Sequence, residues 1–240
     1  MLTPDLRPDA HQFRDLLRER EFRSLWHFTR LACAPAILHH GALYSIEELE
    51  RRGLTVPPRP SRDHDIACGV GDFVKLSTMP YWDMLSSLLR AGEPTVLIEF
   101  STTPILLAGT RFGDRNVWEG GWILGDSFEF ARDYVLVRKP RWRGGSPPEV
   151  YVARELRLVP HARRVLTYTI EEFQLLTECL NRLGIVPSVQ IAPNGPQWPF
   201  PDRCHDDHQR ARGSNLAKVR EYFRHLTIES LDRGVEIDDD

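Results

Sequence analysis

Apolar residues recur every three or four positions in several segments of the chain, a spacing typical of amphipathic helices. In residues 9–22, the apolar side of such a helix holds Phe13, Leu16 and Leu17, with Phe22 at its end. The same spacing predicts helices over residues 31–40, 45–52, 82–90, 170–183 and 215–226, and a helical turn over 128–134.

Two of these helices carry end signals. Gly41 follows the segment 31–40 and suits a left-handed C-terminal cap. Ser45 and Glu48 stand three residues apart at the start of the next helix, which is the spacing of a capping box. Both signals place a helix boundary to within a few residues.

Short apolar or alternating runs predict strands over residues 24–29, 73–77, 95–101, 149–156 and 186–191, and a shorter one over 105–108. The proline-rich segments 57–65 and 193–201 are predicted to be loops. Helices come first and strands later, without a regular strand-helix-strand alternation. This order favours an α+β fold with a mainly antiparallel or mixed sheet.

The 240-residue chain has a net charge of −3, which at first argues against a nucleic-acid partner. From Glu229 onward, six acids and one base contribute −5, so the rest of the chain sums to about +2 and can carry a basic patch. No apolar run is long enough for a transmembrane helix, and residues 1–21 lack the apolar core of a signal peptide. The four cysteines are scattered, so we expect free thiols and a cytoplasmic location.

His27 and Thr29 lie two residues apart on the first predicted strand, so their side chains point to the same face. Such a pair can hydrogen-bond a ribose or a carboxamide. The alternative is a buried histidine at the end of a strand, satisfied by protein groups alone. The spacing by itself does not choose between these two interpretations.

A charged segment contains Arg59 and Arg62, followed by Asp63, His64 and Asp65. The planar guanidinium of arginine can bind two phosphate oxygens at once, which makes this segment a candidate phosphate site. The alternative is a solvated surface loop, the more common meaning of such a cluster.

A second basic segment surrounds the indole of Trp142 with four positive charges, those of Arg138, Lys139, Arg141 and Arg143. Cations that hold a phosphate backbone and a ring that stacks on a base suit single-stranded nucleic acid. The alternative is a basic surface loop without a ligand.

Glu149 opens a predicted strand directly after the segment GGSPP at 144–148. A carboxylate at the start of a strand, next to a flexible loop, is well placed to act on a bound ligand. Strand alternation puts Glu155 on the same face, where it is the second candidate acid. The alternative for Glu149 is an ordinary glutamate at the edge of a strand.

The order and wording of these segments resemble the DarT family, the toxins of DNA ADP-ribosylating toxin–antitoxin systems. The resembling stretches are WHFTRLACAPAILHHGALYS, the segment 59–65, GDFVKLSTMPYWDML, VLIEF and PPEVYVARELRL. Together they span about residues 25–191. Each motif is short, and their order carries the resemblance.

The resemblance implies an ADP-ribosyltransferase domain over residues 1–200, built as a split mixed or antiparallel sheet with flanking helices. Residues 201–240 would then be a helical extension with an acidic tail. The resemblance also implies NAD⁺ as co-substrate and no metal. The implied NAD⁺-binding residues are His27, Phe28, Thr29, Tyr44 and Arg62, and the implied catalytic residues are Glu149 and Arg62.

The resemblance further implies transfer of ADP-ribose to a nucleobase of single-stranded DNA, in a toxin–antitoxin or phage-defence system with a cognate antitoxin as partner. Glu149 would stabilise an oxocarbenium-like transition state. The basic segment 138–143 would hold the DNA, since a base inside a duplex cannot reach a pocket without being flipped out.

One segment departs from the family pattern. The family usually has a His-Asp-Tyr-Val-Pro-like segment where this chain has DFVKLS at 72–77, so the modified base stays open. Either Arg59 or Arg62 fits the family's arginine. Two alternatives remain: an ADP-ribosyltransferase that acts on RNA or protein, and a non-enzymatic module that binds single-stranded nucleic acid.

Overall fold

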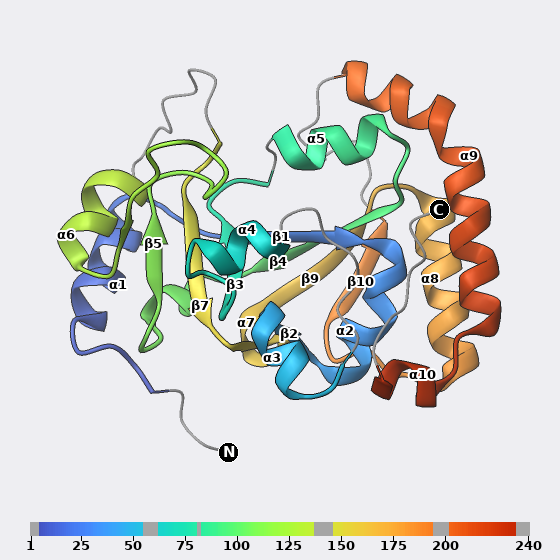
Figure 1. Cartoon of the computed structure of the whole chain (residues 1–240), viewed down its shortest axis with the longest axis horizontal. Coiled ribbons are helices and arrows are strands. Elements are labelled where there is room, and N and C mark those ends of the chain that lie inside the picture. Colours follow the sequence, from blue (N-terminus) through green and yellow to red (C-terminus); the bar gives the residue numbers. More distant parts are fainter. Residues whose placement is uncertain (1–4, 55–61, 81–82, 137–145, 194–201, 234–240) are drawn as a thin grey trace.

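A mixed sheet runs through the centre of the chain. The computed structural model describes residues 5–54, 62–80, 83–136, 146–193 and 202–233 (Figure 1). Its large sheet has eight strands in the order β10-β9-β4-β1-β3-β7-β5-β6, and β2 and β8 form a separate pair. β10 lies parallel to β9, whereas the other described strand pairs are antiparallel. The predicted mixed sheet of an α+β protein is thereby confirmed.

The strands of the described chain have these bounds: β1 (Leu25–Arg30), β2 (Ala42–Tyr44), β3 (Phe73–Ser77), β4 (Thr95–Phe100), β5 (Arg111–Gly113), β6 (Leu124–Gly125), β7 (Glu149–Ala153), β8 (Glu155–Arg157), β9 (Ala162–Thr167) and β10 (Gln190–Pro193). The helices are α1 (Ala10–Glu19), α2 (Ala34–His40), α3 (Ile46–Arg51), α4 (Arg62–Ala67), α5 (Asp83–Arg90), α6 (Phe128–Phe130), α7 (Leu158–His161), α8 (Ile170–Leu183), α9 (Asp202–His225) and α10 (Ile228–Arg233).

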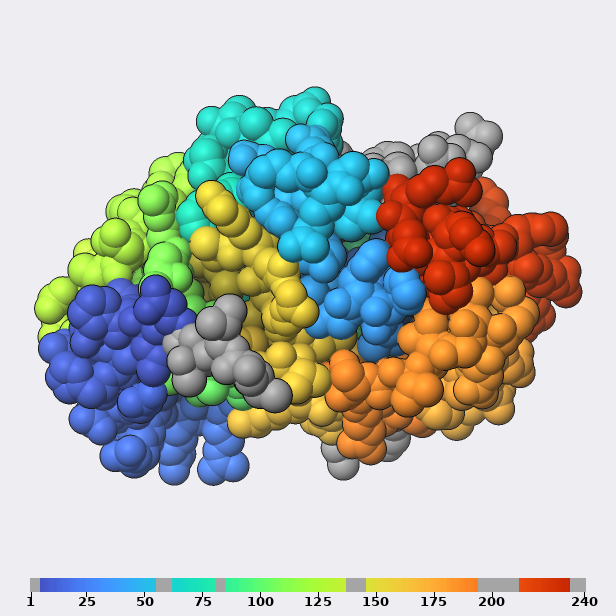
Figure 2. All heavy atoms as spheres, turned by 90° about the horizontal axis from the view of Figure 1, so that it is seen from below, coloured from blue at the N-terminus to red at the C-terminus, as the bar shows by residue number. Residues whose placement is uncertain are grey.

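The helices gather at the two ends of the sheet and on its faces. α1 and α6 lie at the β5 end, whereas α8, α9 and α10 lie at the β10 end (Figure 1). α9 packs against α5 and α8. α10 packs against α2, and Figure 2 shows the C-terminal segment (red) beside the lighter blue of α2 and α3. None of the described helices combines the length and the apolar character that a membrane crossing requires.

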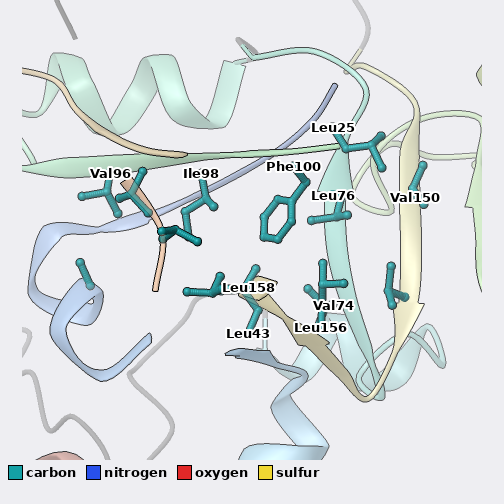
Figure 3. Close-up of a cluster of buried hydrophobic side chains, with 14 of the residues drawn as sticks. Leu25, Leu43, Val74, Leu76, Val96, Ile98, Phe100, Val150, Leu156 and Leu158 are labelled. Atoms are coloured by element: carbon teal, nitrogen blue, oxygen red, sulfur yellow. The ribbon is translucent and has the colours of Figure 1, made fainter. Parts of the chain in front are cut away.

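The main core lies on one face of the sheet, where alternate residues of the strands point inward. Leu25, Val74, Ile98 and Val150 come from four neighbouring strands and belong to one buried cluster (Figure 3). Leu43, Leu156 and Leu158 of the β2–β8 region close this cluster from the other side. A smaller cluster on the opposite face joins α5 to the sheet through Leu85, Leu89, Leu97, Leu166 and Tyr168.

The sheet is split between β1 and β3. These strands pair at one register position, Trp26 with Ser77, whereas β1 pairs with β4 along its whole length. The side chain of His27 spans the gap, because its Nδ1 lies 3.0 Å from the carbonyl oxygen of Lys75. A carbonyl only accepts hydrogen bonds, so Nδ1 carries the hydrogen in this contact.

The helix-end signals are confirmed with one difference. Gly41 is left-handed, with φ of 65°. The Ser45 hydroxyl accepts from the backbone N–H of Glu48 at 3.1 Å. The reciprocal half of the capping box is replaced, because the Ser45 N–H donates to the carbonyl of Arg154 at 2.7 Å. A complete capping box occurs instead at Thr169 and Glu172, at the start of α8.

Three strand predictions differ from the structure. Residues 105–108 were expected to be a strand, but residues Thr103–Leu106 form a 3₁₀ helix with Pro104 in its first turn. The run 149–156 is broken at Arg154, whose φ is 59°. Glu155 therefore lies in β8, paired with β2, and the predicted common face with Glu149 is wrong. The last strand begins at Gln190 rather than at residue 186.

Truncation of Phe13 should test how α1 is held. The Phe13 ring is fully buried, stacked on Phe112 at 5.4 Å between centroids and edge-on to Phe128 at 5.2 Å. We expect Phe13→Ala to lower the free energy of unfolding by about 3–5 kcal/mol, measured by urea denaturation. Val186→Ala is the control, since this side chain is 89% exposed and should change stability by less than about 0.5 kcal/mol. Equal effects of the two substitutions would contradict this packing.

Candidate active site

Glu149 lies at the level where β1 and β3 join. It is the first residue of β7 and pairs with Ser77, which pairs with Trp26 on its other side. Directly paired residues point to the same face of a sheet. The side chains of Glu149 and Tyr151 therefore lie on the face opposite the main core, which takes Val150 and Val152.

The Glu149 carboxylate is buried between two donors. The residue is 5% exposed. The Tyr151 hydroxyl donates to Oε2 at 2.6 Å, and the Asn116 side-chain amide donates to Oε1 at 3.0 Å. Burial raises the pKa of Glu149 to about 7, although Lys75 and both donors pull it down. The carboxyl group is thereby poised between its acid and its base at neutral pH.

Gly113 leaves the room that Tyr151 needs. Gly113 of β5 pairs with Glu149 of β7. A Cβ at this position would lie 2.9 Å from Cε2 of Tyr151, closer than real Cβ contacts allow. Because the Tyr151 ring is fully buried and cannot swing away, a side chain here would push its hydroxyl off Glu149.

Asp65 and Lys75 form an ion pair beside Glu149. Lys75 Nζ lies 2.6 Å from Asp65 Oδ2. Asp65 is 1% exposed, and its other oxygen, Oδ1, has no hydrogen-bond partner in the described part of the chain. A buried carboxylate oxygen without a partner carries a large desolvation penalty. This oxygen is therefore a site where a ligand with an N–H or O–H group would be stabilised.

A cavity lies along the split in the sheet, and Asp65 and Lys75 are part of its wall. Its other walls come from α2, α3, β2 and α10. Most of the lining is apolar, including Ala36, Ile37, Leu43, Ile46, Leu49, Leu54 and Leu231. An apolar cavity with a few convergent polar groups is the usual form of a small-molecule site.

The sequence-predicted residues His27, Thr29 and Tyr44 all line this cavity. Tyr44 is held from outside by Arg52, whose guanidinium carbon stands 4.3 Å from the centre of the ring. Phe28 points to the other face of β1, where it packs against the Leu85 cluster. That face also carries Glu149, so Phe28 and His27 point to opposite faces of the sheet.

Arg62 is the first residue of α4, which extends into the segment that the sequence predicted to be a loop. Its guanidinium forms an ion pair with Glu50 of α3. Asp65 lies one turn later on the same side of α4, because residues three apart are neighbours on a helix. Arg62 is not among the residues that line the cavity. The alternative Arg59, and the predicted nucleic-acid contacts Arg138, Lys139, Arg141, Trp142 and Arg143, lie outside the described residues.

Sequence reasoning missed four polar residues of this site. Asp65 was part of the charged segment but had no role of its own, and Lys75 is a lone charge within the strand FVKLS. A charged residue between apolar neighbours was a usable signal for Lys75. Tyr151 follows from Glu149 by strand alternation. Asn116 is 33 positions from Glu149, so no local pattern connects them.

Solved structures of DarT proteins share this arrangement of elements. DarT from Thermus sp. 2.9 in complex with NAD⁺ matches with a TM-score of 0.54 and 14% identity over 75% of this chain and 98% of that one. Its complex with ADP-ribosylated ssDNA gives a TM-score of 0.54 and 14% identity over 75% and 97% of the two chains. DarTG from Thermosipho africanus in complex with ADP-ribose gives 0.51 and 14% over 72% of this chain and 50% of that one.

No protein-family model matches the sequence, and no curated protein matches it either. The likeness is therefore one of three-dimensional structure, at an identity where it establishes the fold alone. The fold expected from the sequence motifs is confirmed: this chain has the fold of the DarT ADP-ribosyltransferases.

Proposed function

We propose that this chain is an NAD⁺-dependent ADP-ribosyltransferase that modifies a nucleobase of single-stranded DNA. The observation that carries the proposal is the buried Glu149 carboxylate, which two donors hold within the electrostatic reach of Lys75 and Asp65 of the cavity wall. The fold is that of DarT structures solved with NAD⁺ and with ADP-ribosylated ssDNA. A non-enzymatic binding module would give no reason to bury a carboxylate at a pKa of about 7.

In this proposal NAD⁺ occupies the cavity. The apolar wall under α2 and α3 suits the adenine ring, and His27, Thr29 and Tyr44 supply polar groups for the riboses. Asp65 Oδ1 accepts a hydrogen bond from a hydroxyl or amide of the dinucleotide, which satisfies its missing partner. Arg62, one helical turn from Asp65 on α4, binds the diphosphate, since a guanidinium with so high a pKa holds phosphate better than it removes protons.

Glu149 then acts on the ribose next to the nicotinamide. The glycosidic C–N bond breaks, its electron pair leaves with nicotinamide, and positive charge develops on the ribose. An ionised Glu149 stabilises that charge electrostatically, and stabilisation of this kind supplies most of the rate enhancement in many enzymes. A nucleophilic atom of the acceptor base forms the new bond to C1′, and its proton passes to water or to a basic group.

The acceptor and the biological role rest on the sequence. The segment 138–143 has the charges and the indole to hold single-stranded DNA. RNA or protein acceptors fit the same catalytic core and stay as alternatives. A toxin–antitoxin or phage-defence role with a cognate antitoxin follows from the resemblance alone.

Glu149→Gln should abolish transfer. The substitution keeps the size and one acceptor oxygen but removes the charge, so we expect transfer to fall at least about 10²- to 10³-fold. The assay follows labelled ADP-ribose from NAD⁺ to single-stranded DNA, RNA and a protein mixture. Glu155→Gln is the matched control, because that carboxylate pairs with Arg52 and Arg157 in β8 and should leave the rate near wild type.

The possible results separate the alternatives. Label on DNA that disappears with Glu149→Gln supports the proposal, and label on RNA or protein changes the acceptor but keeps the core. A wild-type chain that neither binds nor cleaves NAD⁺ would contradict the proposal and favour the alternative of a non-enzymatic module that binds single-stranded nucleic acid.

The rate should also depend on pH through Glu149. Its folded pKa of about 7 leaves the carboxyl neutral and inactive at lower pH, so kcat/KM should fall below about pH 7 by about tenfold per unit. Lys75 lowers this pKa, so Lys75→Met should move the falling limb to higher pH. The measurement is initial rate against pH for both proteins. A profile that Lys75→Met leaves in place would contradict the electrostatic link.

Asp65→Asn should weaken NAD⁺ binding. The change removes the charge on the unpartnered oxygen, and a hydrogen bond to a charged group is worth enough to raise the Kd about tenfold. Isothermal titration calorimetry with NAD⁺ measures it, and thermal melting checks that the variant is folded. Asp63→Asn on the same helix is the control, since that side chain is 93% exposed. Unchanged affinity of a folded Asp65→Asn would remove Asp65 from the NAD⁺ site.

A further inference from the structure

The loop between β5 and β6 is fixed at both of its ends and in its middle. Asp114 closes it by accepting from the Ile123 N–H at 2.8 Å and donating its own N–H to the Ile123 carbonyl at 3.2 Å. Val117 is buried in a small cluster with Val70 and Tyr151. The loop is therefore a rigid support for any side chain that it exposes.

Trp118 is the side chain that this loop exposes. Its residue is 48% exposed, although it stands next to the buried Val117. One side of the indole is backed by the His64 ring of α4, at 4.6 Å between centroids and 31° between planes. The His64 Nε2 in turn lies 3.2 Å from the carbonyl oxygen of Val117. These contacts hold the indole in place while much of it stays in water.

The same loop holds the Glu149 carboxylate. The Trp118 N–H donates to Asn116 Oδ1 at 2.9 Å, and Asn116 Nδ2 donates to Glu149 Oε1 at 3.0 Å. One side-chain amide therefore separates the backbone of Trp118 from the carboxylate. Neither Trp118 nor His64 is part of the cavity wall, whereas Val70, which packs with Val117 of this loop, is.

The loop also contacts the segment that leads from the basic stretch to β7. The Glu119 carboxylate accepts a hydrogen bond from the N–H of Ser146, which follows Arg143 by three positions in the sequence. An exposed aromatic side chain held in a fixed position is a surface on which an unpaired base can stack.

We infer that Trp118, backed by His64, is the stacking platform for the acceptor nucleobase of single-stranded DNA. This inference rests on the proposed function and adds the residue that brings the acceptor to the reaction. A base stacked on the indole lies on the loop whose Asn116 holds the Glu149 carboxylate. The sequence-predicted stacking residue Trp142 lies outside the described residues, and Trp118 is linked to Glu149 through Asn116.

The test compares Trp118→Ala and Trp118→Phe with wild type in three measurements: the Kd for a fluorescein-labelled single-stranded oligonucleotide of mixed sequence, the KM for that DNA at saturating NAD⁺, and the Kd for NAD⁺. We expect Trp118→Ala to raise the two DNA constants about tenfold or more and to leave the NAD⁺ Kd unchanged. Trp118→Phe keeps a ring and should restore most of the affinity.

Tyr134→Ala is the matched control, because Tyr134 is an aromatic residue that is 53% exposed and packs on Phe130 rather than on His64. It should leave all three constants near wild type. DNA constants unchanged by Trp118→Ala would overturn the inference, and so would an equal loss of NAD⁺ affinity, which would make the indole part of the co-substrate site. The DNA Kd is measured without NAD⁺, so a chain that lacks transferase activity still gives an answer for Trp118.

Discussion

Two buried carboxylates, Asp65 and Glu149, and the partly buried Lys75 meet at one point of the sheet and impose the main physical constraint on this structure. Isolated charges are expensive to bury and tend to neutralise. Here Lys75 compensates Asp65 directly, and Tyr151 and Asn116 donate to Glu149. The compensation is partial, because burial still raises the pKa of Glu149 to about 7 and one oxygen of Asp65 has no described partner.

Several elements of the fold position the side chains of this cluster. β7 delivers Glu149 and Tyr151 to one face, and its register with β3 places Lys75 opposite Tyr151. The Gly113 backbone gives Tyr151 its room. α4 packs Asp65 against the strand from outside the sheet. Each charged group thus comes from a different segment, so the site forms when the sheet forms and not before.

This origin explains what the sequence could predict. α1, β4 and the Gly41 cap follow from local spacing, and all three were predicted. β9 was missed because Arg163 and Arg164 interrupt its apolar pattern, although both pair with Glu99. The break at Arg154 could not be predicted, because a left-handed backbone is usually marked by a glycine and here the residue is an arginine. The resemblance predicted Glu149 as catalytic, but the contacts to its partners other than Tyr151 are long-range in sequence, and no local pattern predicts them.

The remaining charge of the cluster fits the proposed chemistry. With Glu149 ionised, two carboxylates face one ammonium, which leaves one negative charge in a region where low polarity strengthens every interaction. The nicotinamide ring of NAD⁺ is cationic, and the ribose becomes cationic as the glycosidic bond breaks. Both species favour the ionised form of Glu149 over the neutral form. In the proposed reaction, binding of NAD⁺ would therefore lower the pKa that burial has raised and favour the ionised form of Glu149 at neutral pH.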